Sequence, residues 1–175
     1  MTSTVSRRSL LTGSLAALAT QATPRGLHAA PPPVSNPGCV FCQIVAGKRE
    51  AAIVWQDDVC LAFASIQPIQ PGHLLLVPRQ HVENLYGLPD DVGAHLLPVA
   101  ARIGRAIKSS LRADGLSLRQ NNEKAGDQTV FHFHIHLIPR WEGKEVFKTL
   151  VDPPLATAEQ LESAVAPIRK ALSPK

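Results

Sequence analysis

The stretch VFHFHIHLIPR, residues 130–140, alternates apolar and polar residues with a period of two. This period predicts a β-strand, because successive side chains on a strand point to opposite faces. We therefore expect His132, His134 and His136 to share one face. The opposite, core-facing side would carry the apolar residues Phe131, Phe133, Ile135 and Leu137. The rest of the chain is organised around this strand, which holds three of the seven histidines.

A period of three to four residues predicts a long amphipathic helix that begins near Pro89 or Asp90 and runs to about Leu111 or Ala113. Proline and acidic residues stand at its expected start, and Gly115 would end it. Its apolar stripe consists of Val92, Leu96, Val99, Ile103 and Ile107. Pro98 falls inside this helix and should bend it. His95 on the same helix is expected at the surface or at the core edge.

Short strands and one further helix complete the expected elements. The strands are expected at residues 52–55, 59–63, 73–78 and 116–120, the first two forming a hairpin. Cys60 in the second strand is expected to be an inert buried thiol. An amphipathic helix is expected over residues 157–172, capped by Thr157 and interrupted by Pro167.

The first thirty residues differ from the rest of the chain. Arg7 and Arg8 precede a weakly apolar run, residues 10–19, which is too short to serve as a stable membrane anchor. This arrangement resembles a twin-arginine export signal. We therefore expect a signal peptide at 1–30, a proline-rich linker at 31–38 and one globular domain at 39–175, exported to the periplasm. A cytoplasmic protein with a disordered basic N-terminus or a misplaced start is the alternative.

The basic character of the chain comes largely from this leader. The formal net charge is +4, and residues 1–30 contain three arginines and no acidic residue. Without them the charge falls to +1, so we infer no nucleic-acid-binding surface. The 45% hydrophobic content of the 175 residues is ample for a packed core.

Two groups of residues carry candidate chemistry. Histidines at alternate positions can ligate a metal, shuttle protons or attack an electrophile. Cys39 and Cys42 form a C-x-x-C pair, which can be half of a zinc site, a redox dithiol or a disulfide. A four-coordinate zinc site would need two more ligands. Outside residues 130–140 the candidate histidines are His28, His73, His81 and His95. These residues alone leave the alternatives open.

The combination of motifs between Cys39 and Arg140 resembles the histidine triad (HIT) family. The resemblance rests on the C-x-x-C pair, the segment PGHLLLVP at 71–78, the Asn-Asn loop, the residues QTV at 128–130 and the three alternating histidines. It implies an α+β fold with an antiparallel sheet of about five strands, one long helix packed on it and a C-terminal helix. It also implies a homodimer formed across the long helix and a central strand.

The family resemblance implies that the chain is a nucleotide hydrolase or transferase. The expected substrate is a purine nucleoside phosphoramidate or an adenylated amine, cleaved through a nucleotidyl-histidine intermediate. His134 would be the nucleophile and His136 would contact the phosphate. The substrate-binding residues would be His73, Ser65, Asn122 or else Asn121, Gln128 and Thr129. A dinucleoside polyphosphate hydrolase, a nucleotide-binding module with little turnover and a metal-handling protein are the alternatives.

Zinc-bearing bacterial members imply one structural Zn²⁺ per chain. Its ligands here would be Cys39, Cys42, His81 and His132, a closed set of two thiolates and two imidazoles. The alternatives are that His132 stays with the phosphate group, or that the two cysteines form a disulfide outside the cytoplasm.

Two positions depart from the family pattern. Ser65 stands where the family usually has an aspartate that binds both ribose hydroxyls, and a serine forms only one such bond well. Asp127 stands where the family usually has a glycine before the glutamine, and a carboxylate close to a phosphate is repulsive unless it turns outward.

Overall fold

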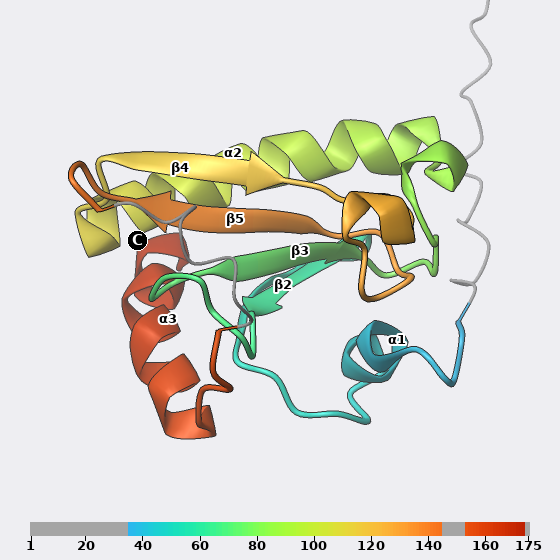
Figure 1. Ribbon diagram of the computed structural model, residues 1–175, viewed down its shortest axis with the longest axis horizontal. Coiled ribbons are helices and arrows are strands. Elements are labelled where there is room, and N and C mark those ends of the chain that lie inside the picture. The colour runs from blue at the N-terminus through green and yellow to red at the C-terminus, as the bar shows by residue number, and fades with distance from the viewer. Residues whose placement is uncertain (1–34, 145–152, 174–175) are drawn as a thin grey trace, which may run out of the picture. The chain divides into compact units, whose positions relative to one another are not determined.

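The computed structural model describes residues 35–144 and 153–173 (Figure 1). The expected signal peptide and residues 31–34 of the expected linker lie outside the described residues. No helix within 35–144 or 153–173 has the length and apolar character needed to cross a membrane.

Five antiparallel strands form a single sheet, as expected. In chain order they are β1 (Ile53–Gln56), β2 (Cys60–Ala64), β3 (Leu74–Pro78), β4 (Gly115–Arg119) and β5 (Ile135–Arg140). Their order across the sheet is β1-β2-β3-β5-β4, which makes β1 and β4 the edges. The predicted hairpin is formed by β1 and β2, and β3 lies at the centre, where Leu75 is paired with His136 of β5.

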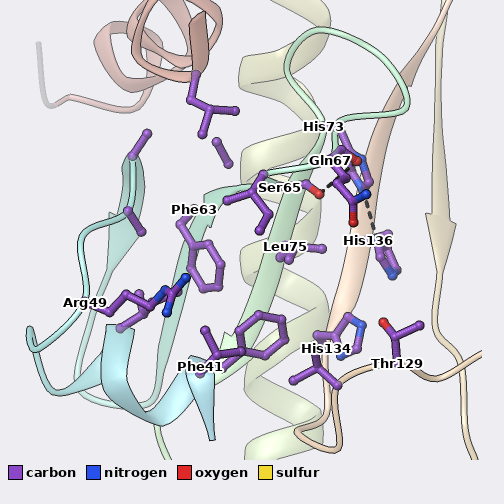
Figure 2. Close-up of a pocket in the computed structure, with 18 of the residues that line it drawn as sticks. Phe41, Arg49, Phe63, Ser65, Gln67, His73, Leu75, Thr129, His134 and His136 are labelled. Atoms are coloured by element: carbon purple, nitrogen blue, oxygen red, sulfur yellow. Dashed lines mark hydrogen bonds between the residues drawn. The ribbon is translucent and has the colours of Figure 1, made fainter. Parts of the chain in front are cut away.

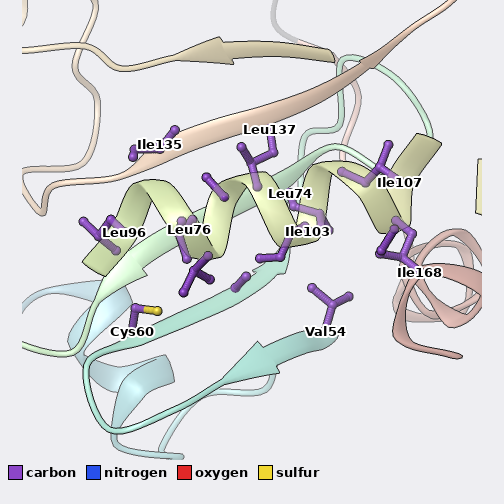
Figure 3. Packing of buried hydrophobic residues seen from close by; sticks show 14 of the residues in the cluster. Val54, Cys60, Leu74, Leu76, Leu96, Ile103, Ile107, Ile135, Leu137 and Ile168 are labelled. Carbon is purple, nitrogen blue, oxygen red and sulfur yellow. The ribbon is translucent and has the colours of Figure 1, made fainter. Parts of the chain in front are cut away.

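Two helices, α2 (Asp90–Leu111) and α3 (Ala158–Leu172), pack with one face of the sheet in the larger core cluster. The predicted stripe of α2 is buried, and Figure 3 shows Leu96, Ile103 and Ile107 lying against the strands. The short helix α1 (Val40–Val45) contributes to a smaller cluster on the other face, together with Leu61, Phe63, Leu75 and Val77. That second face carries the candidate site.

Two of the three predictions about helix-breaking residues, those for Gly115 and Pro167, were wrong in detail. Helix α2 ends at Leu111 because Arg112 adopts the left-handed conformation, with φ of 53°, whereas Gly115 is already the first residue of β4. Pro167 lies inside α3 without ending it. Val165, Ile168 and Leu172 are buried around this proline, so core packing holds the helix together where one backbone hydrogen bond is lost.

The predicted strand over residues 130–140 was also too long. Strand β5 begins at Ile135, so His132 and His134 precede it. The backbone N–H of Phe133 donates to the carbonyl of Val82, and that of His132 donates to Val130, so neither joins the sheet ladder. The apolar alternation persists nevertheless, since Phe133, Ile135 and Leu137 all enter the larger core cluster.

Candidate active site and metal centre

A groove crosses the sheet face opposite α2 (Figure 2). Its volume is about 1410 Å³. One wall is apolar and includes Phe41, Ile44, Ile53, Phe63 and Leu75. The opposite end is polar and includes His73, His134, His136, Thr129, Asn121 and Arg119. The groove therefore presents an apolar surface and a cluster of imidazoles side by side.

His134 has a defined tautomer. Its Nδ1 lies 2.7 Å from the backbone carbonyl oxygen of His132. Because a carbonyl only accepts hydrogen bonds, Nδ1 carries the proton and the lone pair belongs to Nε2. The side chain is 4% exposed, and burial lowers the pKa of the imidazole, which favours the neutral form. A neutral imidazole with a free Nε2 lone pair is a competent nucleophile.

His73 and His136 form a second ordered pair, drawn as a dashed line in Figure 2. The backbone N–H of Ile69 donates to Nδ1 of His73 at 3.1 Å, so Nε2 of His73 carries the proton. That nitrogen donates to Nδ1 of His136 at 2.9 Å. His136 is therefore protonated on Nε2 and offers an N–H donor. The pKa of His73 is lowered to about 4 and that of His136 to about 3, in both cases mainly because the ring is buried.

The two asparagines of the loop have different roles. Asn121 lines the groove, and its side chain donates to the carbonyl of Asp127 at 3.2 Å. Asn122 does not line the groove, because its Oδ1 accepts the backbone N–H of Leu85 at 2.8 Å. Asn121 is therefore the one of the two that lies at the groove, and which of them contacts substrate stays a prediction.

Gln128 lines the groove, but its amide is engaged within the protein. Its Oε1 accepts the backbone N–H of Glu123 at 2.8 Å, and its Nε2 donates to the carbonyls of Glu83 and Val130. The side chain is 3% exposed. These bonds hold the loop between β4 and the histidines in place, which is a positioning role.

Ser65 and Thr129 both line the groove, as their predicted roles require. The Ser65 hydroxyl donates to the carbonyl of Gln67 at 3.2 Å, and the residue is buried. Thr129 is exposed, and its side chain lies near His134 and His136 in Figure 2.

Arg119 and the apolar wall were missed by sequence reasoning. Arg119 ends β4 and is the register partner of His136, which places a cation beside the imidazole pair. Its only sequence signal was a position in a predicted strand. The pairing of that strand with the histidines appears only in the fold.

The four predicted metal ligands converge at the start of α1. Nδ1 of His132 lies 3.5 Å from Sγ of Cys39 and 3.6 Å from Sγ of Cys42. Nδ1 of His81 lies 3.3 Å from Sγ of Cys42 and 3.4 Å from Nδ1 of His132. Zn–S bonds of about 2.3 Å and Zn–N bonds of about 2.0–2.1 Å place tetrahedral ligands about 3.3–3.8 Å apart. The donor set and its spacing therefore fit a four-coordinate metal.

The surroundings of these ligands support the same interpretation. Nε2 of His132 donates to the carbonyl of Pro78 at 2.9 Å, which turns the lone pair of Nδ1 toward the two sulfurs. Cys39 and Cys42 are free thiols, not a disulfide. Burial is the main cause that raises the pKa of Cys42, and a bound cation would counter this by stabilising the thiolate.

A second cluster, Asp57, Cys60 and His95, lies outside the groove. The Asp57 carboxylate accepts hydrogen bonds from His95 Nε2 at 2.9 Å, Trp55 Nε1 at 3.0 Å and two backbone N–H groups. Cys60 is fully buried, as predicted, and burial and the nearby carboxylate raise the pKa of its thiol to about 12. This polar centre ties the β1–β2 hairpin to α2.

Known proteins resemble the chain over most of its described length. The HIT domain family matches residues 46–143. Protein hit of Bacillus subtilis is 38% identical over 141 residues, 77% of this chain and 94% of that protein. An adenosine 5′-monophosphoramidase of Candida albicans is 32% identical over 61% of this chain and 72% of that protein. An adenylylsulfatase of Arabidopsis thaliana is 36% identical over 59% of this chain and 53% of that protein.

Solved structures share the fold. A Hit-like protein from Bartonella henselae matches with a TM-score of 0.73 at 32% identity, over 79% of this chain and 99% of that chain. A zinc-bound histidine triad family protein from Mycobacterium smegmatis matches with a TM-score of 0.69 at 34% identity, over 77% and 93% respectively. Sequence, fold and the arrangement of the alternating histidines agree, and the chain belongs to the histidine triad (HIT) family.

Proposed function

We propose that this protein is a nucleotide hydrolase that acts at the α-phosphate of a purine nucleotide, with His134 as the nucleophile. The observation that carries the proposal is the bond from Nδ1 of His134 to the carbonyl of His132, which leaves Nε2 unprotonated in a groove-lining ring. A buried neutral imidazole whose free nitrogen belongs to a groove-lining ring has the form that nucleophilic catalysis requires.

The proposed reaction has two steps. Nε2 of His134 attacks the α-phosphorus, a P–N bond forms, and the bond to the leaving group breaks with its electron pair going to that group. An amine leaving group also takes up a proton from water as it departs. Water then attacks the same phosphorus and loses a proton to solvent, while the P–N electron pair returns to Nε2 and the nucleoside monophosphate is released. Both transition states carry charge on the non-bridging oxygens, which N–H and O–H donors stabilise.

Different parts of the groove would bind the base, the ribose and the phosphate of the nucleotide. The apolar wall that contains Phe41 and Phe63 suits the purine base, and Ser65 lies between this wall and the histidines, where a ribose hydroxyl would lie (Figure 2). Nε2–H of His136 and the hydroxyl of Thr129 are donors that lie close to the proposed nucleophile (Figure 2). A single serine hydroxyl in place of a carboxylate predicts modest affinity for the ribose.

The substrate that we favour is a purine nucleoside phosphoramidate or an adenylated amine. A relative named as an adenosine 5′-monophosphoramidase supports this class. Dinucleoside polyphosphate hydrolysis and nucleotide binding with little turnover remain the alternative functions.

We further propose one structural zinc ion per chain, held by Cys39, Cys42, His81 and His132. The spacing of their donor atoms and the existence of a zinc-bound relative of similar fold support the proposal. With all four positions filled by protein atoms, zinc would bind no substrate and would act by fixing α1 and the start of the histidine segment.

Export by a twin-arginine signal concerns residues outside 35–144 and 153–173 and stays a prediction.

The function is tested by measuring AMP release from adenosine 5′-phosphoramidate. We expect turnover by the wild type, a loss of about a thousandfold or more in His134→Ala, and little change in AMP affinity. His95→Gln is the matched control, since His95 lies outside the groove. AMP binding without release by the wild type would favour the binding module instead.

A further inference from the structure

Arg119 brings a positive charge to the polar end of the groove, where the histidines lie. It is the last residue of β4 and lies opposite His136 on β5. Directly opposed residues on neighbouring antiparallel strands project from the same face of the sheet, with Cβ atoms about 4.5–5.5 Å apart. Arg119 therefore emerges beside His136, and its side chain lines the groove.

Two hydrogen bonds hold the guanidinium in place and leave some of its N–H donors without a protein acceptor among the described residues. Its Nε donates to Oδ1 of Asn121 at 3.0 Å, and Nη2 donates to Oδ2 of Asp127 at 3.4 Å. A guanidinium has five N–H donors, so three remain for a ligand. The side chain of Arg119 is 31% exposed and that of Asp127 is 81% exposed, so the ion pair is weak and a bound anion can replace the carboxylate.

The charge matters for the group that leaves the α-phosphorus. A sulfate or phosphate group leaves as an oxyanion that carries the electron pair of the broken bond and needs no proton. An amine leaves as a neutral molecule after it takes up a proton. A guanidinium that contacts the departing group stabilises the developing charge of the first kind of group and not of the second.

We propose that Arg119 sets the leaving-group preference of this site, favouring oxyanion over amine leaving groups, with Asp127 competing for the guanidinium. This inference rests on the proposed nucleotide hydrolysis and assigns a leaving-group specificity to one residue of that site. Asn121 acts as a positioning residue, since its side chain bridges Arg119 and the loop carbonyl of Asp127.

The test compares two substrates that differ only in leaving group, adenosine 5′-phosphosulfate and adenosine 5′-phosphoramidate. We expect Arg119→Leu to lower kcat/KM for the phosphosulfate by about 10- to 100-fold and for the phosphoramidate by less than about threefold. Arg119→Lys should recover part of the loss, and Asp127→Asn should raise kcat/KM for the phosphosulfate.

Arg49 provides the matched control, because it also lines the groove but lies at the apolar end near Phe63 (Figure 2). Arg49→Leu should change both substrates by the same factor. An equal loss on both substrates in Arg119→Leu, or no loss on either, would overturn the specificity role alone. Failure of the wild type to hydrolyse either compound would overturn the proposed function and this inference together.

Discussion

Glu123, in the loop that leads to the histidines, has a backbone conformation that strongly favours glycine. Its φ is 63° and its ψ is 166°, a region that residues with a Cβ rarely occupy. Its N–H is fixed by Oε1 of Gln128 and its carboxylate accepts a hydrogen bond from Asn84. The loop is thus held in a strained form beside the groove.

Glycine at this position should stabilise the protein. We expect Glu123→Gly to raise the free energy of unfolding by about 1 kcal/mol, because the steric strain is relieved. Glu123→Ala is the matched variant, since it also loses the bond to Asn84 but keeps a Cβ. Urea denaturation measures both, and a glycine variant no more stable than the alanine variant would show that the conformation is not strained.

At the scale of single residues, the sequence predicted residue types better than their roles. The motif positions of His73, His134 and His136 fall in one groove. The choice between Asn121 and Asn122 and the bracing role of Gln128 depend on which backbone groups lie nearby, namely those of Leu85, Glu83 and Val130. Those long-range neighbours leave no mark on the local pattern.

Among the elements, the strands and the two long helices were predicted, whereas the short helix α1 was not. The stripe of α2 and the β1–β2 hairpin follow from hydrophobic periods that span several turns or two strands. Helix α1 has six residues and no side-chain cap, which is too short for a period to be read. This helix is nevertheless essential to the site, because it places Phe41 in the groove wall and Cys42 beside His81.

Loss of the proposed zinc should loosen α1 and the histidine segment. We expect Cys42→Ser to contain no zinc by elemental analysis and to lose at least about 3 kcal/mol of unfolding free energy, because metal binding is linked to folding. Cys60 is buried and is not one of the four proposed zinc ligands, so a Cys60→Ser variant should still contain zinc. A wild-type protein without zinc, or a Cys42→Ser variant that retains it, would contradict the ligand set.

At the scale of the whole molecule, β4 is an edge of the sheet and bears the exposed Leu118, which is 49% accessible. Leu97 on α2 is 61% accessible. A sheet edge that exposes apolar side chains among the described residues favours pairing with a second chain. We therefore propose the homodimer that the family resemblance predicts, in which β4 would become a central strand of a larger sheet.

The dimer is tested by placing a charge at this edge. Leu118→Glu should convert a dimer into a monomer in sedimentation equilibrium, because two buried carboxylates would face each other near the symmetry axis. Leu155→Glu is the control, at a residue that is 71% exposed and lies just before α3. A monomeric wild type, or a dimer unchanged in Leu118→Glu, would exclude this interface.

The central claim, that His134 carries the nucleotide during turnover, is tested most directly by intact-protein mass spectrometry. The purified protein is mixed with adenosine 5′-phosphoramidate and quenched rapidly without acid, since phosphohistidine bonds are acid-labile. The account predicts a transient adduct of one adenylyl group in the wild type and none in His134→Ala. An adduct that persists in His134→Ala, or that maps to another residue of the wild type, would contradict it.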